Sequence, residues 1–161
     1  MRFWAGLTLK QRILDGLCIL LCLGMVIYDI ISYVNLPEII PLNYNFSGEA
    51  TGYGKKYTIF ILLGIVLIVT ASLCVMLRIP GFYKMINVPW PVPWGREPLL
   101  IIATKDFLCW CNLCMTAIFA YLNFCIASQR KPGIFVWIPT AALLVLTVLF
   151  ILKLRRISKG K

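Results

Sequence analysis

The stretch ILDGLCILLCLGMVIYDIISYV, residues 13–34, decides the fold class of this chain. It is as long as the roughly twenty residues that a helix needs to cross the core of a bilayer. Three more apolar runs of similar length follow, at residues 57–77, 107–128 and 134–152. Length favours helices over strands here, and in lipid a helix satisfies its own backbone hydrogen bonds. The sequence therefore predicts an all-α, polytopic integral membrane protein, a bundle of four transmembrane helices forming one membrane domain over residues 1–161.

Composition and charge point to the same class. Hydrophobic residues make up 61% of the chain, whereas soluble domains have about 45–50%. The net charge of +10 does not indicate nucleic-acid binding, because the basic residues lie at the ends of the apolar runs, as membrane flanks do. The chain has no histidine, which removes His-based general-base chemistry and most zinc sites. We therefore expect the lipid bilayer as the main partner, with no metal and no cofactor.

The Lys and Arg residues predict the orientation. Twelve of the 16 fall on the side that holds both termini and the middle loop, and four fall on the other side. The positive-inside rule then places both termini in the cytoplasm of a bacterial cell, with the protein in the inner membrane. The loop at residues 35–56 faces outward. In the middle loop Trp90 and Trp94 alternate with prolines, and we expect these indoles at headgroup level.

Polar residues recur on one face of two of the predicted helices. In the first helix they share a stripe at three- and four-residue steps, and a similar stripe runs along the third helix. The candidate intramembrane polar site comprises Asp15, Asp29, Lys105, Asn112 and Asn123. Two readings are open: contacts between helices, or a polar track with a proton site.

The outer end of the first helix suggests a specific ion pair. Asp29 lies near that end, and Lys55 and Lys56 lie at the outer start of the second helix. A carboxylate close to the bilayer interface is less costly beside a cation. Because the loop joins neighbouring antiparallel helices, the sequence predicts that Asp29 pairs with Lys55 or Lys56.

The seven cysteines include a Cys-x-x-Cys at Cys111 and Cys114, with Cys109 nearby. Four helices with this motif resemble quinone-linked, disulfide-forming membrane enzymes. Those enzymes also need a cysteine pair in an outward loop, and neither outward loop here contains cysteine. Thiols on the cytoplasmic side stay reduced. We expect the cysteines to act as small apolar residues, and a thiol-dependent membrane enzyme remains an alternative.

The outward loop has the composition of an ordered cap. Pro37 and Pro41 restrict the backbone, and three glycines permit conformations closed to other residues. Aromatic residues are interspersed among them. The candidate site residues of this loop, structural or binding, are Pro37, Pro41, Asn45, Gly48, Glu49, Gly52, Tyr53, Gly54 and Lys55.

The spacing of these residues resembles the signature of a bacterial membrane family, domain of unknown function 1648, which is also found in SdpI-type immunity proteins. Two positions depart from the family pattern: its frequent histidine is Asn43 here, and its Pro-Asp after Gly-Glu is Ala50-Thr51. The resemblance implies a non-enzymatic membrane protein whose outward loop acts in recognition, immunity or sensing. A peptide toxin or another membrane protein would be its partner. The alternative is a small membrane transporter or the thiol-dependent enzyme.

Overall fold

The computed structural model describes residues 6–79 and 93–159, and in these ranges the chain is mostly helical. The elements, in chain order, are α1 (Leu9–Tyr33), β1 (Ile39–Tyr44), β2 (Ala50–Lys55), α2 (Thr58–Met76), α3 (Glu97–Ala127), the 3-10 helix η2 (Ile134–Val136) and α4 (Trp137–Ser158). Trp90, which was expected at headgroup level, lies outside the described residues. So do Arg2, Lys84 and Lys161, three of the basic residues from which the orientation was predicted.

Within the described residues, four helices are long and apolar enough to cross a membrane: α1, α2, α3, and α4 together with η2. Helix α3 begins at Glu97, well before the predicted start at residue 107, and Pro98 lies in its first turn. Proline fits there because the first backbone N–H groups of a helix have no intrahelical acceptor. The prediction from apolar residues missed the segment at residues 97–106 because the charged residues Lys105 and Asp106 interrupt the apolar run. A helical backbone accommodates both residues.

Helix α1 begins with a capping box. The Thr8 hydroxyl accepts a hydrogen bond from the backbone N–H of Gln11 at 3.3 Å, and the Gln11 side chain accepts one from the Thr8 N–H at 3.0 Å. These two bonds satisfy donors that the first helical turn would leave free, which defines where the helix starts.

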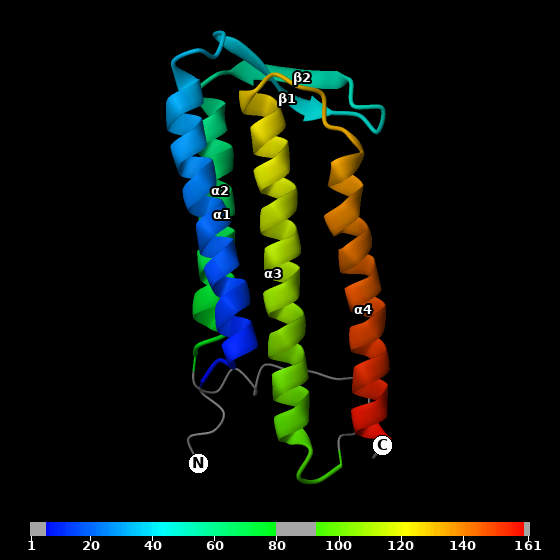
Figure 1. Ribbon diagram of the computed structural model, residues 1–161. Coiled ribbons are helices and arrows are strands. Elements are labelled where there is room, and N and C mark those ends of the chain that lie inside the picture. Colours follow the sequence, from blue (N-terminus) through cyan, green and yellow to red (C-terminus); the bar gives the residue numbers. More distant parts are fainter. Residues whose placement is uncertain (1–5, 80–92, 160–161) are drawn as a thin grey trace.

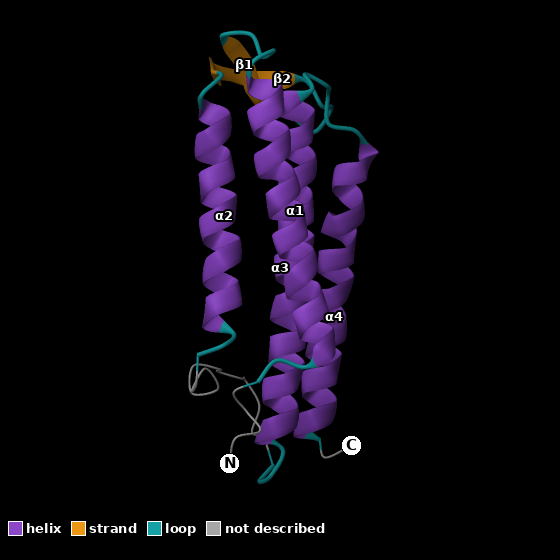
Figure 2. Cartoon of the chain, turned by 60° about the vertical axis from the view of Figure 1, so that its left-hand side comes forward, coloured by secondary structure: helices purple, strands orange, loops and turns teal. Residues whose placement is uncertain are grey.

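The helices run side by side, with α3 in contact with each of the other three (Figure 1). Helix α1 also contacts α2, and α2 is separate from α4 in the rotated view (Figure 2). Of the residues of α4, only Leu154 and Ile157 are buried. The end at which α1 begins and α4 finishes is called the terminal end below, and the opposite end is called the hairpin end.

Residues 39–55 form an antiparallel β-hairpin across the hairpin end (Figures 1 and 2). The expected all-α class did not include these two strands. In the register Ile40 lies opposite Gly54 and Pro41 opposite Tyr53, and the ladder has irregularities near Asn43. The segment reads as a loop in sequence because proline and glycine weaken a strand pattern. Both are tolerated here because the sheet has only two strands, and each strand is therefore an edge.

The hairpin is held down by a hydrophobic cluster beneath it. Ile40 of β1 and Ile59 of α2 are fully buried, and they pack with Leu36, Ile126 and Ala127. Burying a side chain of this size contributes about 1.5–3 kcal/mol. The cluster joins the hairpin to α2 and α3, so the segment between α1 and α2 is a packed part of the fold.

Candidate functional site

The turn of the hairpin is organised by Asn45. Its side-chain oxygen accepts hydrogen bonds from the N–H groups of Ser47 and Glu49 at 3.0 and 2.8 Å, and its amide donates to the Glu49 carboxylate at 3.0 Å. The backbone N–H of Asn45 also donates to the Glu49 carbonyl at 2.9 Å. Asn45 thus stabilises the turn through both its side chain and its backbone. These bonds explain why Asn45 is followed four residues later by Glu49.

Three glycines of the hairpin lie where a side chain would meet nearby atoms. Gly48 has φ +74°, and a Cβ placed there would lie 2.9 Å from the carbonyl oxygen of Pro132 in the α3–α4 connection. Only glycine adopts this conformation without strain. A Cβ at Gly54 would meet the side chain of Leu42, and Gly52 faces Asn43.

A pocket of about 240 Å³ opens between the hairpin turn, the α3–α4 connection and the start of α4. It is lined by Tyr44, Asn45, Phe46, Gly48, Pro132 and Trp137, together with Leu122, Gly133 and Val136. We call it the turn pocket. Its lining combines aromatic rings with backbone and amide groups, the mixture expected of a site that binds an apolar group and orients it with hydrogen bonds.

Two aromatic residues of the turn pocket stand out. Phe46 is 92% exposed, and its ring stacks on Trp137 with centroids 6.2 Å apart. The hydroxyl of Tyr44 is buried and has no hydrogen-bond partner within the described residues. Burial raises the pKa of Tyr44, so the phenol stays protonated and remains a donor. An unpaired buried hydroxyl costs free energy until a partner reaches it.

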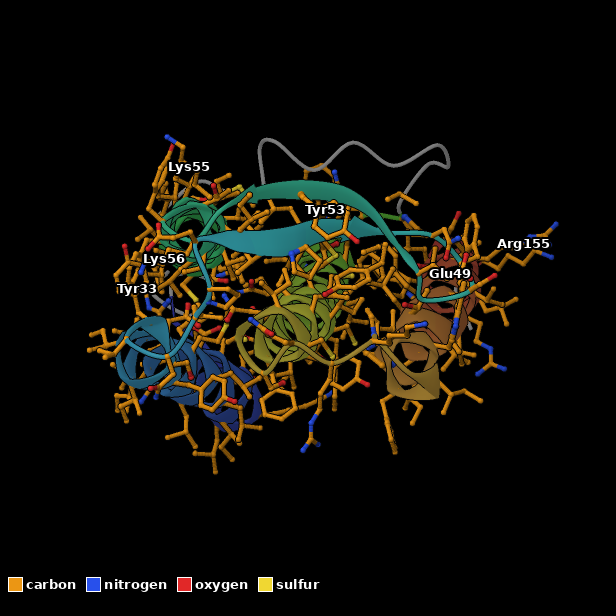
Figure 3. All side chains as sticks on the ribbon, turned by 90° about the horizontal axis from the view of Figure 1, so that it is seen from above. Tyr33, Glu49, Tyr53, Lys55, Lys56 and Arg155 are labelled. Carbon is orange, nitrogen blue, oxygen red and sulfur yellow. The ribbon has the colours of Figure 1, made fainter. Side chains whose placement is uncertain are left out.

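The predicted pairing of Asp29 with Lys55 or Lys56 is wrong. Lys56 pairs with Glu38 at 2.9 Å and lies over the ring of Tyr33, whereas Asp29 accepts a hydrogen bond from Asn123 of α3 at 3.1 Å. Asp29 is on the face of α1 that packs against α3, and the lysines lie above the helix ends (Figure 3). The hydrogen bond with Glu38 raises the pKa of Lys56.

The predicted polar residues of α1 and α3 all point into the protein. Asp15, Asp29, Lys105, Asn112 and Asn123 are each at most 5% exposed. They lie at several levels along the helices and do not form one cluster. The structure brings Asp29 and Asn123 together, and it places Asn112 near Thr70 of α2, whose carbonyl accepts from the Asn112 amide at 3.4 Å.

Sequence reasoning missed several partners of these residues. The Asp15 carboxylate pairs with Arg78 at 2.7 Å, just beyond the end of α2. The Thr70 and Thr116 hydroxyls are 3.0 Å apart between α2 and α3. Thr70, in the middle of the apolar run of α2, was the available signal for this contact, because a hydroxyl in such a run needs a hydrogen-bond partner.

A further polar cluster joins α1 to α3 at the terminal end. The Gln11 amide donates to Asp106 at 2.7 Å, and Lys10 lies 3.6 Å from the same carboxylate.

All seven cysteines are free thiols. Cys114 is buried, Cys111 is half-buried, and Cys109 donates a weak hydrogen bond to Asp15 at 3.9 Å. Cys109 belongs to a hydrophobic cluster with Leu14 and Leu77, whereas the two thiols of the Cys-x-x-Cys are not bonded to each other.

The comparisons with known proteins concern the hairpin and its flanking helices. No curated protein and no solved structure matches the chain. The matched segment runs from the middle of α1 through the hairpin and into α2, so it contains Asn45, Gly48 and the other turn residues described above. Residues 20–67 match the family model described as Domain of unknown function (DUF1648).

Proposed function

We propose that the chain is a multi-pass protein of the bacterial inner membrane, a bundle of four transmembrane helices in one domain. Large apolar side chains cover the outside of the helices; in α4, Leu144 is 64% exposed and Val148 is 57% exposed. Continuous apolar surface of this extent is unfavourable in water and is matched by lipid. The exposed helix faces are thus the observation that supports membrane insertion.

The distribution of charge supports the orientation in which the hairpin end faces outward. The terminal end carries most of the described basic residues, among them Lys10, Arg12 and Arg78, with Arg155 and Arg156 in the last turn of α4. The hairpin end carries Lys55, Lys56, Arg130 and Lys131. An excess of Lys and Arg marks the cytoplasmic side.

The hairpin is the recognition element in this proposal. The observation that carries it is the turn pocket: it is open at the surface, has the exposed Phe46 at its rim, and is lined by Tyr44, whose buried hydroxyl lacks a partner among the described residues. A peptide side chain that enters the pocket would cover the aromatic rings of Tyr44, Phe46 and Trp137. The kinship with SdpI-type immunity proteins, which the sequence resemblance implies, favours an immunity or sensing role toward a secreted peptide. The role is non-enzymatic.

A protection assay tests the recognition role. Cells with and without the gene are grown in spent medium from cells of the same strain, which holds their secreted peptides. We expect the chain to protect the cells. Gly48→Val, which distorts the turn beside Pro132, is expected to abolish protection at unchanged membrane levels. Gly95→Val is the matched control, because Gly95 has a similar positive φ (+82°) with no atom within 4 Å of its Cβ position. Full protection by the Gly48 variant would exclude the hairpin from recognition.

A small transporter is the second candidate, and Asp29 is the observation that favours it. Asp29 is fully buried, and one of its carboxylate oxygens has no hydrogen-bond partner within the described residues. Intramembrane carboxylates often mark proton or ion paths. Purified protein in vesicles loaded with a pH-sensitive dye tests this directly. Proton flux that exceeds that of empty vesicles and is lost in the Asp29→Asn variant would support transport. Flux equal to that of empty vesicles would exclude the transporter hypothesis.

A further inference from the structure

The two edges of the hairpin differ in what they offer to another strand. In the register Pro41 lies opposite Tyr53, and the N–H of Lys56 donates to the carbonyl of Glu38 at 3.0 Å. Bonded and non-bonded pairs alternate along an antiparallel ladder. Counting from the bonded pair Glu38–Lys56, Pro41 and Tyr53 form a non-bonded pair. The backbone groups of both residues therefore point away from the partner strand.

The outer edge of β1 is therefore blocked and that of β2 is open. Proline has no N–H to donate, so Pro41 interrupts the row of donors on the β1 edge. Tyr53 and Lys55 direct their N–H and C=O groups to the edge of β2, which faces away from α1 and from the α3–α4 connection (Figure 3). The described residues contain only two strands, and none of the backbone hydrogen bonds outside the hairpin involves Tyr53 or Lys55. An open edge of this kind is a template for another strand.

Charge is arranged along β2 so that two copies of the strand complement each other. Glu49 precedes the strand and Lys55 ends it; both are exposed, with Tyr53, 68% exposed, between them. Among the described residues Lys55 takes part in no ion pair, whereas its neighbour Lys56 is paired with Glu38. Figure 3 shows Glu49 and Lys55 at opposite ends of the hairpin.

The orientation of the hairpin makes pairing between two copies possible within one membrane. The strands lie across the helix ends (Figure 1). A two-fold axis parallel to the helices therefore turns β2 of one copy antiparallel to β2 of the other. Such an axis relates two copies with the same membrane orientation, and two-fold dimers are the commonest oligomers.

We propose that the chain forms a homodimer in which the β2 edges of two copies pair around Tyr53, giving a four-stranded antiparallel sheet over the hairpin end. Tyr53 of each copy exchanges both backbone hydrogen bonds with Tyr53 of the other. Lys55 of each copy then faces Thr51 of the other directly, and it reaches Glu49 of the other on the diagonal, within range of long side chains. The dimer does not depend on what the turn pocket binds.

Cross-linking of the full chain in membrane vesicles tests the pairing. Tyr53→Cys places two thiols opposite each other, and a disulfide needs Cα atoms closer than about 7 Å. Ser47→Cys is the matched control, because it is exposed on the same hairpin away from the axis. Under mild oxidation we expect at least about fivefold more disulfide-linked dimer from Tyr53→Cys than from Ser47→Cys or from the chain with its native thiols alone.

Charge variants in the Tyr53→Cys background test the register. Lys55→Glu is expected to lower the cross-linked fraction about fivefold, since it turns two attractive pairs into repulsive ones. Lys131→Glu makes the same charge change off the strand and is expected to have no effect. Glu49→Lys also removes the carboxylate that accepts a hydrogen bond from Asn45, so the double variant Lys55→Glu/Glu49→Lys is compared with each single variant and is expected to cross-link more than either. Equal cross-linking of the Ser47 and Tyr53 variants would overturn the dimer. The dimer would also be overturned if the introduced thiol of the Tyr53→Cys variant reacted with a maleimide but formed no disulfide-linked dimer. In that case the β2 edge would be free to bind a different peptide.

Discussion

The carboxylate of Asp29 in α1 accepts a hydrogen bond from the side-chain amide of Asn123 in α3 at 3.1 Å, and both residues are buried. This contact joins the halves of the two helices that lie toward the hairpin end. It also accounts for a carboxylate in an otherwise apolar helix face, because a charge or acid group in lipid needs a donor within the protein.

Removing the amide is expected to be more harmful than removing the charge. Asn123→Ala leaves the buried carboxylate without its donor and is expected to lower the free energy of unfolding by about 1–2 kcal/mol. Asp29→Asn keeps a polar pair and removes a buried charge, so we expect a loss below about 1 kcal/mol. The double variant Asp29→Ala/Asn123→Ala is expected to be more stable than Asn123→Ala alone. Unfolding in mixed detergent micelles measures all three, and a larger loss for Asp29→Asn than for Asn123→Ala would contradict the assignment.

Gly48 and Gly95 separate backbone strain from steric contact. Both have positive φ, so alanine at either position is expected to cost about 1–2 kcal/mol. Gly48→Ala carries an additional cost, because its Cβ would lie 2.9 Å from the Pro132 carbonyl, whereas the Cβ at Gly95 meets nothing within 4 Å. We expect a lower melting temperature for Gly48→Ala than for Gly95→Ala, and faster proteolysis within the hairpin. Equal melting temperatures would show that the turn does not rest on the α3–α4 connection.

The pair Asp15–Arg78 fastens α1 to the end of α2. Arg78→Gln leaves the buried Asp15 carboxylate without its cation, and we expect a loss of about 1–3 kcal/mol, reduced from the value for a fully buried pair because the arginine side chain is 47% exposed. Lys10→Gln is the comparison: the Lys10–Asp106 pair is longer, at 3.6 Å, and more exposed, so its loss is expected to stay below about 1 kcal/mol. The ordering would be contradicted if Lys10→Gln proved the more destabilising change in thermal unfolding of the detergent-solubilised protein.

The orientation predicts which residues an impermeant thiol reagent reaches in intact cells. In a cysteine-free version, a cysteine replacing Ser47 in the hairpin turn is expected to react from outside, and one replacing Ser158 at the end of α4 is expected to react only after the cells are opened. Ser47 lies in the hairpin turn and Ser158 is the last residue of α4, so the two positions lie at opposite ends of the protein. Protection of position 47 with labelling of position 158 would reverse the orientation.

The cysteines of the Cys-x-x-Cys are expected to be replaceable. Cys111→Ala combined with Cys114→Ala removes two free thiols, one half-buried and one buried, and alanine is also small and apolar, so we expect near-normal membrane levels and full activity in the protection assay. Cys109→Ala is expected to cost slightly more stability, because its thiol contacts Asp15. Loss of protection at normal membrane levels in the double variant would restore the thiol-dependent enzyme as a candidate.

The helices and the polar faces were predictable from the chain alone. Four apolar runs of membrane-spanning length lead to four helices, and the spacing of Asp15, Asp29, Asn112 and Asn123 places all four on buried faces. Both signals are local, because the period of a helix follows from the backbone. The spacing of Pro41, Asn45 and Gly48 likewise indicated an ordered loop, although not its strands.

The partners were decided only by the tertiary structure. Which side chain meets Asp29 depends on the rotation of α1 about its axis, which the packing against α3 determines, and so the amide of Asn123 and not a lysine lies beside it. Lys56 lies beside Glu38 because the hairpin folds back over the helix ends. The same packing buries the Tyr44 hydroxyl, which has no hydrogen-bond partner among the described residues. The sequence by itself determined what depends on neighbours within a few residues, namely helix, polar face and turn. Contacts between distant residues depend on how whole elements pack, and periodicity within one element carries no information about the element opposite it.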